Sequence, residues 1–377
     1  MLLMGCLLMQ AQEQKPWALK ALHALKTYID SSAVKGIDPK YLEVPEKPWA
    51  LVIKTNVNDM NLTSTTKMSE ELLATHMVAG EMNFETKFKP DREVSIGAWL
   101  GYRGYGLSYS YSLHRSKGRN FSIGATGSNY GFNLRIRRFF TDELSAHYWG
   151  HDEKNTVDVL YDDAQTWDDI KIKSAIFDAF YLLNGKHFSY AAAYDQSMNQ
   201  IRSAGSLMVG VKWFQVSVDY SKPLNGILIQ YLGDVGRFKI HKGSIGVGYA
   251  YNWVPMRNLL VNVMAMPMLT VYNRTKLYYY ESNYDVFMEE GDVSTDGRKV
   301  VPDDDSWTKD ITLKERDTEI KYGRPSLSLD ARASITYQFD RFFLCVSGQY
   351  NRYNNKANDN ELNLTDWNVN ASLGVRF

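Results

Sequence analysis

The sequence has no long apolar run. A transmembrane helix needs about 20 consecutive, mostly apolar residues, and every apolar stretch inside this chain is interrupted by charged or polar residues within a few positions. A helical membrane protein is therefore excluded. A membrane-spanning β-barrel is not excluded, because each of its strands carries only a weak hydrophobic signal.

The sequence also has no excess of either charge and almost no cysteine. The 43 basic residues balance the 43 acidic residues, whereas a nucleic-acid-binding protein usually carries a basic excess, so we expect no nucleic-acid partner. The only cysteines are Cys6 and Cys345, and no intramolecular disulfide is possible if the N-terminus is removed. Aromatic residues are abundant at 13%. Tyr and Trp favour strands and membrane–water interfaces.

The N-terminal residues predict export. Residues 1–11 are mostly apolar and end at Ala11, a plausible cleavage site, as in the last part of a signal peptide. The basic region that normally comes first is missing, so we expect the true start to lie upstream. A lipoprotein signal with Cys6 as the lipidated residue is the alternative, although Cys6 lies very near the start. Residues 12–48 are predicted to form a short periplasmic segment with a helix over residues 16–32.

From Trp49 onward, apolar and polar residues alternate. Between Leu327 and Phe339 the alternation continues for thirteen residues without interruption, and a period of two is typical of a strand with two different faces. Strands in soluble sheets average about 5–6 residues, whereas a strand that crosses a membrane needs about 9–11. Strand length therefore favours a membrane barrel over a soluble β-sandwich.

The alternation predicts fifteen strands. They cover residues 49–57, 81–88, 93–101, 105–113, 120–126, 129–139, 170–183, 186–195, 205–212, 214–221, 240–253, 258–273, 326–339, 341–353 and 366–377. A closed bacterial barrel has an even number of strands, so one strand is misassigned or missed. We predict 12, 14 or 16 strands, with 14 favoured.

The predicted connections alternate between short turns and long loops. The long loops fall at residues 140–169, 222–239, 274–325 and 354–365, and Asn184-Gly185 is a hairpin signal among the short turns. Bacterial outer-membrane barrels show this pattern, with the short turns in the periplasm. Counting back from Phe377 places both termini of the barrel on the periplasmic side.

Eight charged residues are candidates for the lumen. These are Arg135, Arg137, Lys171, Lys173, Asp219, Asp330, Arg332 and Arg376. The basic residues either line a lumen that prefers anions or pair with Asp178, Asp195, Asp219 and Asp330 in structural salt bridges, and the sequence leaves both possibilities open. The strand at 170–183 has an ambiguous phase, because Phe177 has the parity of Lys171 and Lys173. A β-bulge there would resolve the conflict.

No pattern in the sequence indicates catalysis or metal binding. A Gly-x-Ser-x-Gly nucleophile elbow is missing. The acidic loops do not match the spacing of an EF-hand, and His147 and His151 lack the Glu of a His-Glu-x-x-His zinc motif. We expect no enzyme, cofactor or metal. A hydrolase of the lipase or protease type on the barrel wall is the alternative, because a catalytic set drawn from distant strands is invisible in sequence.

Several short motifs carry a family resemblance. Residues 38–45 read Asp-Pro-Lys-Tyr-Leu-Glu-Val-Pro and are followed by Trp49, and residues 94–102 lead through a short turn to Leu-Ser-Tyr-Ser at 107–110. Over roughly residues 38–377 the chain resembles a family of Bacteroides-type bacteria known as domain of unknown function 4421. The resemblance implies a secreted outer-membrane barrel and supplies no catalytic or binding residue.

The end of the chain is similar to the signal that the barrel-assembly machinery reads. From Trp367 to Phe377 every second residue is apolar, and the chain ends Val375-Arg376-Phe377. We therefore expect the apolar face of this strand to contact lipid, and we expect Val375 and Phe377 to serve as the assembly signal.

The sequence as a whole predicts an all-β protein. Its architecture would be an antiparallel transmembrane outer-membrane β-barrel of about 14 strands over residues 49–377, preceded by the short helical segment. The predicted function is a pore or small-solute conduit, or a structural surface protein. The expected partners are outer-membrane lipid, lipopolysaccharide and the barrel-assembly machinery.

Overall fold

One antiparallel sheet dominates the structure. The computed structural model describes residues 16–68, 81–88, 92–113, 118–151, 156–282, 312–357 and 360–377. Fourteen strands in these ranges form a single sheet, and two short strands, β1 and β9, form a second one. No helix in the described ranges is both long and apolar enough to cross a membrane.

The strands of the large sheet follow the alternating segments of the sequence. They are β2 (Trp49–Met68), β3 (Glu81–Phe88), β4 (Glu93–Tyr102), β5 (Tyr105–Ser112), β6 (Arg119–Thr126), β7 (Tyr130–His151), β8 (Thr156–Leu182), β10 (Ala204–Asp219), β11 (Val235–Met256), β12 (Leu259–Ser282), β13 (Leu313–Tyr322), β14 (Ser326–Phe339), β15 (Phe342–Ala357) and β16 (Asn360–Arg376). The remaining elements are α2 (Pro16–Val34), β1 (Leu42–Glu43), α4 (Tyr190–Tyr194), β9 (Asn199–Gln200), η2 (Pro223–Asn225) and α5 (Gly226–Tyr231).

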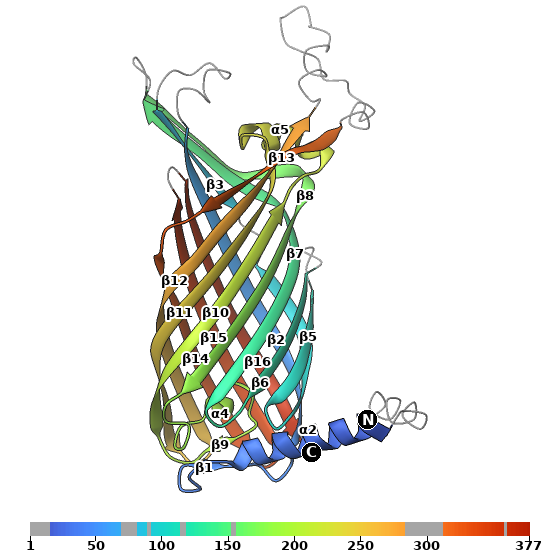
Figure 1. The fold of residues 1–377 in the computed structure, drawn as a ribbon, viewed down its shortest axis with the longest axis vertical. Helices are drawn as coiled ribbons and strands as arrows, with labels where there is room; N and C mark the ends of the chain where they lie inside the picture. Colours follow the sequence, from blue (N-terminus) through green and yellow to red (C-terminus); the bar gives the residue numbers. More distant parts are fainter. Residues whose placement is uncertain are drawn as a thin grey trace, which may run out of the picture.

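The large sheet closes on itself (Figure 1). Each strand pairs with its neighbour in the order β11-β10-β8-β7-β6-β5-β4-β2-β16-β15-β14-β12, and pairing of β11 with β12 closes this ring of twelve strands. The other two strands extend the sheet: β13 pairs with β12, and β3 pairs with both β2 and β7. The prediction of an all-β antiparallel barrel with a 14-stranded sheet is confirmed.

Two errors and one omission explain why the predicted number of strands is odd. Residues 205–212 and 214–221, predicted as two strands, belong to the single strand β10. Residues 186–195, predicted as a strand after an Asn184-Gly185 hairpin, form a turn and the helix α4. The omitted strand is β13, which lies in a predicted loop.

The barrel is narrower toward its loop end, because β3 replaces three strands there. In the lower part β4, β5 and β6 lie between β2 and β7, with Asn58 opposite Glu93 and Arg138 opposite Arg119. Farther up, Phe88 of β3 is paired with β2 on one side and β7 on the other. Fewer strands enclose a smaller lumen, so this end of the barrel is constricted.

Several predicted long loops are in fact extensions of strands. Most of residues 140–169 belongs to β7 and β8, and most of residues 354–365 belongs to β15 and β16. Residues 222–239 contain η2, α5 and the start of β11. Within the predicted loop 274–325, the acidic residues between 289 and 305 lie outside the described ranges. The strands therefore continue well beyond the length needed to cross a membrane.

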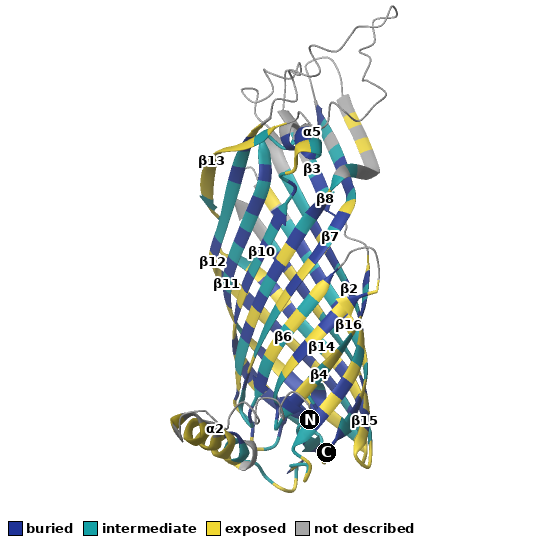
Figure 2. Ribbon diagram, turned by 90° about the vertical axis from the view of Figure 1, so that its right-hand side faces the viewer, coloured by how far each residue is buried: buried dark blue, intermediate teal, exposed yellow. Residues whose placement is uncertain are grey.

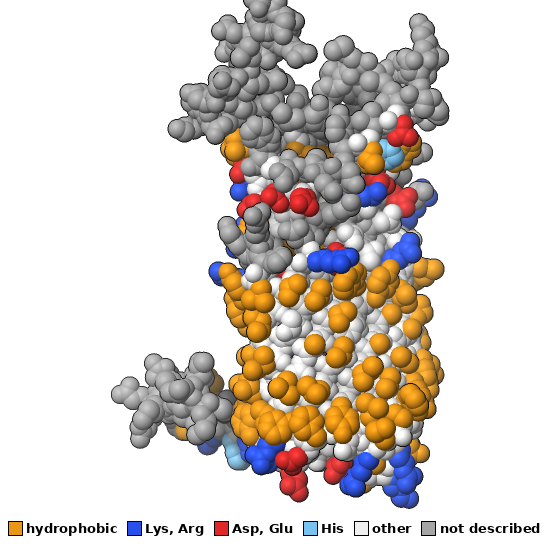
Figure 3. Space-filling view, turned by 180° about the vertical axis from the view of Figure 1, so that it is seen from behind, with side chains coloured by type: hydrophobic (Ala, Val, Ile, Leu, Met, Phe, Trp, Pro, Cys, Tyr) orange, Lys and Arg blue, Asp and Glu red, His pale blue; other side chains and the backbone are white. Residues whose placement is uncertain are grey.

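The outer surface carries an apolar belt. Exposed residues alternate with buried ones along the strands (Figure 2), and hydrophobic side chains cover the middle and lower parts of the wall (Figure 3). Aromatic side chains form both edges: Phe132, Tyr181, Tyr249, Tyr251, Trp253, Tyr337, Phe339 and Phe342 below, and Tyr109, Tyr111, Phe121, Trp213, Tyr272 and Tyr350 above. A belt with aromatic edges is the surface that a transmembrane barrel presents to lipid.

The short turns, α2 and both chain ends lie together at the lower end of the barrel (Figure 1). Trp49 and Phe377 close the ring there, since each backbone N–H donates to the other's carbonyl at 3.2 and 3.0 Å. The helix α2 is fixed to the rim by Asp30, whose carboxylate accepts a 2.7 Å hydrogen bond from the Tyr102 hydroxyl. The predicted signal segment and Cys6 lie outside the described residues.

Candidate functional site in the barrel lumen

A folded plug closes the lower end of the lumen. It consists of residues 183–203, which connect β8 to β10 and include α4 and β9 (Figure 1). Three consecutive alanines of α4, Ala191 to Ala193, are almost fully buried. Small side chains allow the helix to approach the wall closely, and Ser189 caps its N-terminus by accepting a 3.2 Å bond from the Ala192 N–H. We call residues 183–203 the plug.

Hydrogen bonds hold the plug to strands all around the barrel. Tyr194 donates to Asn262 of β12 at 2.7 Å, and Gln196 donates to Thr336 of β14 at 3.1 Å. Arg376 of β16 donates twice to the Gln196 carbonyl, at 2.8 and 3.1 Å. The strand β9 pairs with β1 of the N-terminal segment. These polar contacts, which can be made and broken without disrupting the barrel wall, add to the apolar packing of the plug against the wall.

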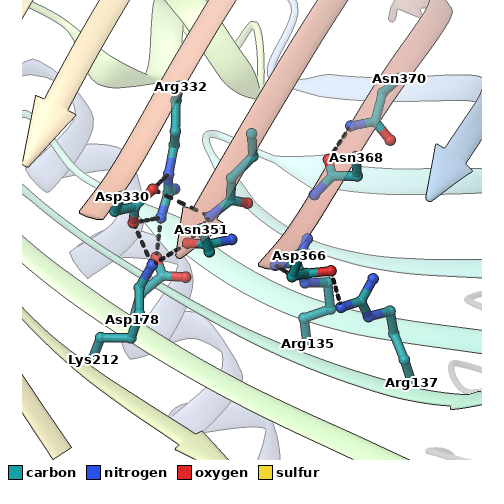
Figure 4. Close-up of polar contacts among 11 residues, drawn as sticks. Arg135, Arg137, Asp178, Lys212, Asp330, Arg332, Asn351, Asp366, Asn368 and Asn370 are labelled. Carbon is teal, nitrogen blue, oxygen red and sulfur yellow. Dashed lines mark hydrogen bonds and ion pairs between the residues drawn. The ribbon is translucent and has the colours of Figure 1, made fainter. Parts of the chain in front are cut away.

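Above the plug, a charged cluster crosses the lumen (Figure 4). The buried carboxylate of Asp330 accepts hydrogen bonds from Lys212 of β10 and from Arg332, two residues along β14. Lys212 also donates to Asn351 at 2.7 Å, and Arg332 lies 3.3 Å from Asp178 of β8. Burying a charge without a partner is costly, and here two carboxylates balance two cations. We call these five residues the Asp330 cluster.

A second charged cluster connects β7 to β16. Arg137 donates a 2.6 Å hydrogen bond to Asp366, and Arg135 lies 3.8 Å from the other oxygen of the same carboxylate. Asp366 is fully buried. One carboxylate faces two guanidinium groups, and Arg135 keeps two buried nitrogens, Nε and Nη2, without a hydrogen bond. This cluster therefore presents a partly unsatisfied positive charge.

A polar cavity of about 220 Å³ lies between the plug and the wall. Its lining includes Lys54, Asn56, Asn58, Asn120, Ser122, Asn133, Arg135, Asp178, Tyr190, Tyr194, Asp195, Arg332, Gln349, Asn368 and Asn370. Lys54 of β2 has no carboxylate partner among the described residues, and it repels Arg135 across the cavity. Buried amide nitrogens of Asn58 and Asn368 also lack acceptors. The cavity thus offers several free donors and two cations that are not fully neutralised, together with the Asp178 carboxylate, whose oxygens also lack hydrogen bonds.

Asp195 lines the cavity from the plug side. Burial raises the pKa of this carboxyl to about 6, because a buried carboxylate loses its hydration. Ser197 counteracts the shift by donating from its backbone N–H at 3.1 Å and from its hydroxyl at 2.6 Å. The charge at the plug therefore changes within an accessible pH range.

Toward the loop end, apolar side chains fill the lumen. Inward residues of β8 and β10 such as Ile172, Ile176, Phe214 and Val216 are at most 2% exposed, and Phe214 stacks on Tyr353 of β15 at 4.7 Å. They belong to one contiguous buried cluster that also includes Phe88 of β3. This region, the apolar constriction, is packed like a protein core. The lumen is thus closed at two levels, with the polar cavity nearer the plug.

The structure places the eight candidate lumen residues in two groups. Arg135, Arg137, Asp330, Arg332 and Arg376 lie inside the barrel, where they pair with carboxylates or with the plug. Lys171, Lys173 and Asp219 lie on the outside, so their prediction was wrong. The strand β8 has no bulge between residues 170 and 182, and its other parity, Ile172 to Phe180, faces the lumen. The prediction rested on a lumen that is polar along its whole length. In the apolar constriction, by contrast, the apolar side chains of the strand point inward and the charged side chains point outward.

Sequence analysis missed Lys54, Lys212 and Asp366. Lys212 was placed at the end of the predicted strand 205–212, because β10 was divided in two. Each of the three is a single charged residue in a segment that otherwise alternates like a strand. This isolated charge was a signal in the sequence that could have identified them as candidates for the lumen. Met264, Met266 and Met268 also point inward, and they pack with the plug residues Phe188 and Tyr190.

Two histidines have described side-chain partners. His147 binds Asp158 at 2.8 Å and stacks on Trp149. His187 contacts Asn184 at 2.9 Å and Asp38 at 3.4 Å. In both cases a carboxylate is placed to orient the imidazole ring. In the described ranges, no three His, Cys, Asp or Glu side chains gather at metal-binding distance.

Comparison with known families gives a family without an assigned activity. Residues 38–377 match the model of the family described as "Domain of unknown function (DUF4421)". The match covers most of the chain, so this protein belongs to that family, as its sequence motifs indicated. No curated protein is similar to it in sequence.

Solved structures that resemble the chain are remote. The outer membrane protease OmpT from Escherichia coli is 8% identical, with a TM-score of 0.31, and the match covers 89% of this chain and 98% of OmpT. The translocator domain of the autotransporter NalP from Neisseria meningitidis is 8% identical, with a TM-score of 0.30, and the match covers 96% of this chain and 98% of that domain. The COG4313 outer membrane channel from Pseudomonas putida F1 is 9% identical, with a TM-score of 0.28, and the match covers 90% of this chain and 100% of the channel. Such distant likeness assigns no activity to this chain.

Proposed function

We propose that this protein is a gated conduit for small anionic solutes in the bacterial outer membrane, with the plug as its gate. The apolar belt supports the membrane location, and the short turns at the plug end support a periplasmic position for that end. The long hairpins would then extend from the cell surface.

The polar cavity between the two closed levels carries this proposal. A barrel with a purely structural role has no need of free cationic donors in its interior, and unpaired buried polar groups are destabilising. Lys54 and Arg135 both line the cavity, and neither charge is fully neutralised. A carboxylate or phosphate group would satisfy both cations and the free amides of Asn58 and Asn368. A volume of about 220 Å³ suits a small solute.

The plug can move without opening the wall. The strands β8 and β10 pair directly with each other up to Leu182 and Met208, so the plug is an insertion between two strands that are already joined. Its docking relies on hydrogen bonds such as Tyr194–Asn262 and Arg376–Gln196. Rotamer changes of Phe214 and Tyr353, which stack in the constriction, would complete the path.

A disulfide between plug and wall tests the gate. The Cys345 sulfur lies 3.9 Å from the Ala193 carbonyl oxygen, so cysteines introduced singly at Ala192 and Ala193 should include one that bonds to Cys345. In liposomes, the reduced protein should admit small anions or show brief openings in bilayer recordings, and the oxidised protein should not. The same variant before and after reduction is its own control. Equal flux in both states, with the disulfide verified by mass, would refute the gate.

A structural surface protein is the second candidate, because the lumen is closed at two levels. A wild-type barrel that never conducts, together with a variant that lacks the plug and carries Phe214→Ala and Tyr353→Ala but still does not conduct, would favour this role. Hydrolysis of esters or peptides by the non-conducting barrel would instead favour the wall-hydrolase alternative.

A further inference from the structure

A row of cations crosses the outside of the wall above the apolar belt. It follows the pairing register through five neighbouring strands, which Figure 1 shows side by side. Arg138 pairs with Lys173, Lys173 with Ser217, Ser217 with Lys239, and Lys239 with Lys276. Neighbouring strands are about 5 Å apart, so four cations lie along roughly 20 Å of the wall. We call these four the basic row.

The side chains of the basic row face away from the lumen. Their sequence neighbours Phe139, Ile172, Phe238 and Ile240 are buried in the apolar constriction, and successive side chains in a strand point to opposite faces. More positive charge lies directly beside the row, at Lys171 above it and Arg274 below it. Three of the eight candidate lumen residues therefore lie on this outer surface: Lys173 in the row, Lys171 beside it, and Asp219, which pairs with Lys171 across the strands.

Carboxylates do not neutralise the basic row. In the part of the chain that the structure describes, no row cation forms an ion pair within 4.0 Å. Three nearby acids are engaged elsewhere. Asp219 accepts two bonds from Ser221, and Glu315 binds Arg237 at 2.9 Å. Glu319, which lies opposite Leu277, forms an ion pair with Lys321 at 3.3 Å. The row therefore keeps its positive charge available to an external ligand.

Aromatic rings hold three of the four cations in place. The Lys239 and Lys276 ammonium groups lie 5.1 and 4.7 Å from the centre of the Tyr278 ring, and Arg138 lies 4.9 Å from that of Phe140. A cation–π contact orients a side chain and leaves its charge intact. The cations are thus positioned as a group before any ligand binds.

The height of the row identifies the class of ligand. Trp213 and Tyr272 stack at 5.4 Å and mark the upper edge of the belt. Ser217 lies four residues beyond Trp213 on β10, which is about 13 Å along the strand and about 10 Å along the axis of a tilted barrel. Headgroups lie outside the hydrocarbon core, so the middle of the row lies beyond the belt, on the side of the outer-leaflet headgroups.

We propose that the basic row binds the phosphate groups of a phosphorylated glycolipid of the lipopolysaccharide type in the outer leaflet. Lys and Arg form charge-assisted hydrogen bonds to phosphate oxygens, and the acyl chains of the same molecule would lie on the adjacent apolar belt. This inference rests on the proposed outer-membrane location and is independent of conduction through the lumen.

A charge-neutral triple variant tests the site. The wild type, the variant Lys173→Gln/Lys239→Gln/Lys276→Gln and the matched control Lys35→Gln/Lys40→Gln/Lys47→Gln, changed in the N-terminal segment, are each reconstituted into phosphatidylcholine vesicles. Binding of bisphosphorylated lipid A is then measured by native mass spectrometry. We expect at least a tenfold loss of affinity in the row variant and none in the control. Wild-type binding should also weaken as salt rises.

Three outcomes would overturn the site. These are wild-type affinity in the row variant, an equal loss in the control, and equal binding of lipid A that lacks phosphate. Competition by millimolar inorganic phosphate alone would show a simple phosphate site and refute the lipid ligand. Altered migration on boiling in SDS verifies that each variant is folded. Conductance is recorded on the same samples, so failure of this site and failure of the conduit are separable.

Discussion

Arg137 and Asp366 join two nearly opposite walls of the barrel, with a nitrogen–oxygen distance of 2.6 Å. Between β7 and β16 the shorter way around the ring passes through four other strands, β6, β5, β4 and β2. Both side chains are at most 2% exposed. This ion pair therefore fixes the shape of the lumen and brings Arg135 to the edge of the cavity.

Removing the Asp366 charge should destabilise the barrel. Asp366→Asn leaves Arg137 buried without a carboxylate, and breaking a buried pair in this way costs about 3–5 kcal/mol. Urea unfolding in detergent measures the change. Asp340→Asn, an exposed substitution, is the control, and an equally small effect of both would contradict the structural role of the pair. The apolar double variant Arg137→Met/Asp366→Leu should lose less stability than Asp366→Asn.

Replacing Lys54 should separate selectivity from stability. Lys54 has no described ion-pair partner, so Lys54→Met should leave the free energy of unfolding unchanged or slightly raised. Anion preference should fall several-fold in reversal-potential measurements, because one of the two cations of the cavity is gone. Lys40→Met, in the N-terminal segment, should alter neither quantity. Unchanged selectivity of Lys54→Met would remove the cavity from the conduction path.

Opening of the plug should depend on pH through Asp195. The pKa of the docked carboxyl is about 6, above its ordinary 3.8, so the docked state binds the proton more tightly. The equilibrium constant for docking of the plug is therefore largest below pH 4. It falls as the pH rises to about 6, by at most about a hundredfold in total. Open probability recorded between pH 4 and 7 should rise accordingly. Asp195→Asn should flatten this profile, and a pH dependence identical to that of the wild type would assign it to another group.

Phe377 should be needed for assembly. Its side chain is 52% exposed on the outer face of the last strand, so deleting it creates no cavity in a core. We expect less folded barrel in the outer membrane of an expressing cell, measured as the heat-modifiable fraction. Phe342→Ala removes a similarly exposed aromatic ring at the same end of the barrel, and this variant serves as the control. Equal assembly of the two variants would mean that Phe377 is an ordinary belt residue.

The sequence by itself determined the existence of the barrel and the positions of most of its strands. A period of two over more than ten residues is a local property. It identified the whole of β14, and it identified β16 from Asp366 onward. It also identified the N-terminal helix, because Pro16 and the apolar stripe from Leu19 to Ile29 are local signals. The continuation of β7 and β8 far beyond the membrane was missed, since charged residues in strands resemble loops.

Only the tertiary structure decided which face of each strand meets the lumen. Alternation divides the residues of a strand between its two faces, but it does not indicate which of the two faces meets the lumen. Where the lumen is polar, as around Arg135 and Asp330, polar residues do point inward. In the constriction, Val216 and Val218 point inward instead, and Lys173 points out, because ring closure brings apolar side chains from many strands together. The plug, the Asp330 cluster and the basic row all depend on that closure, which joins residues more than a hundred positions apart.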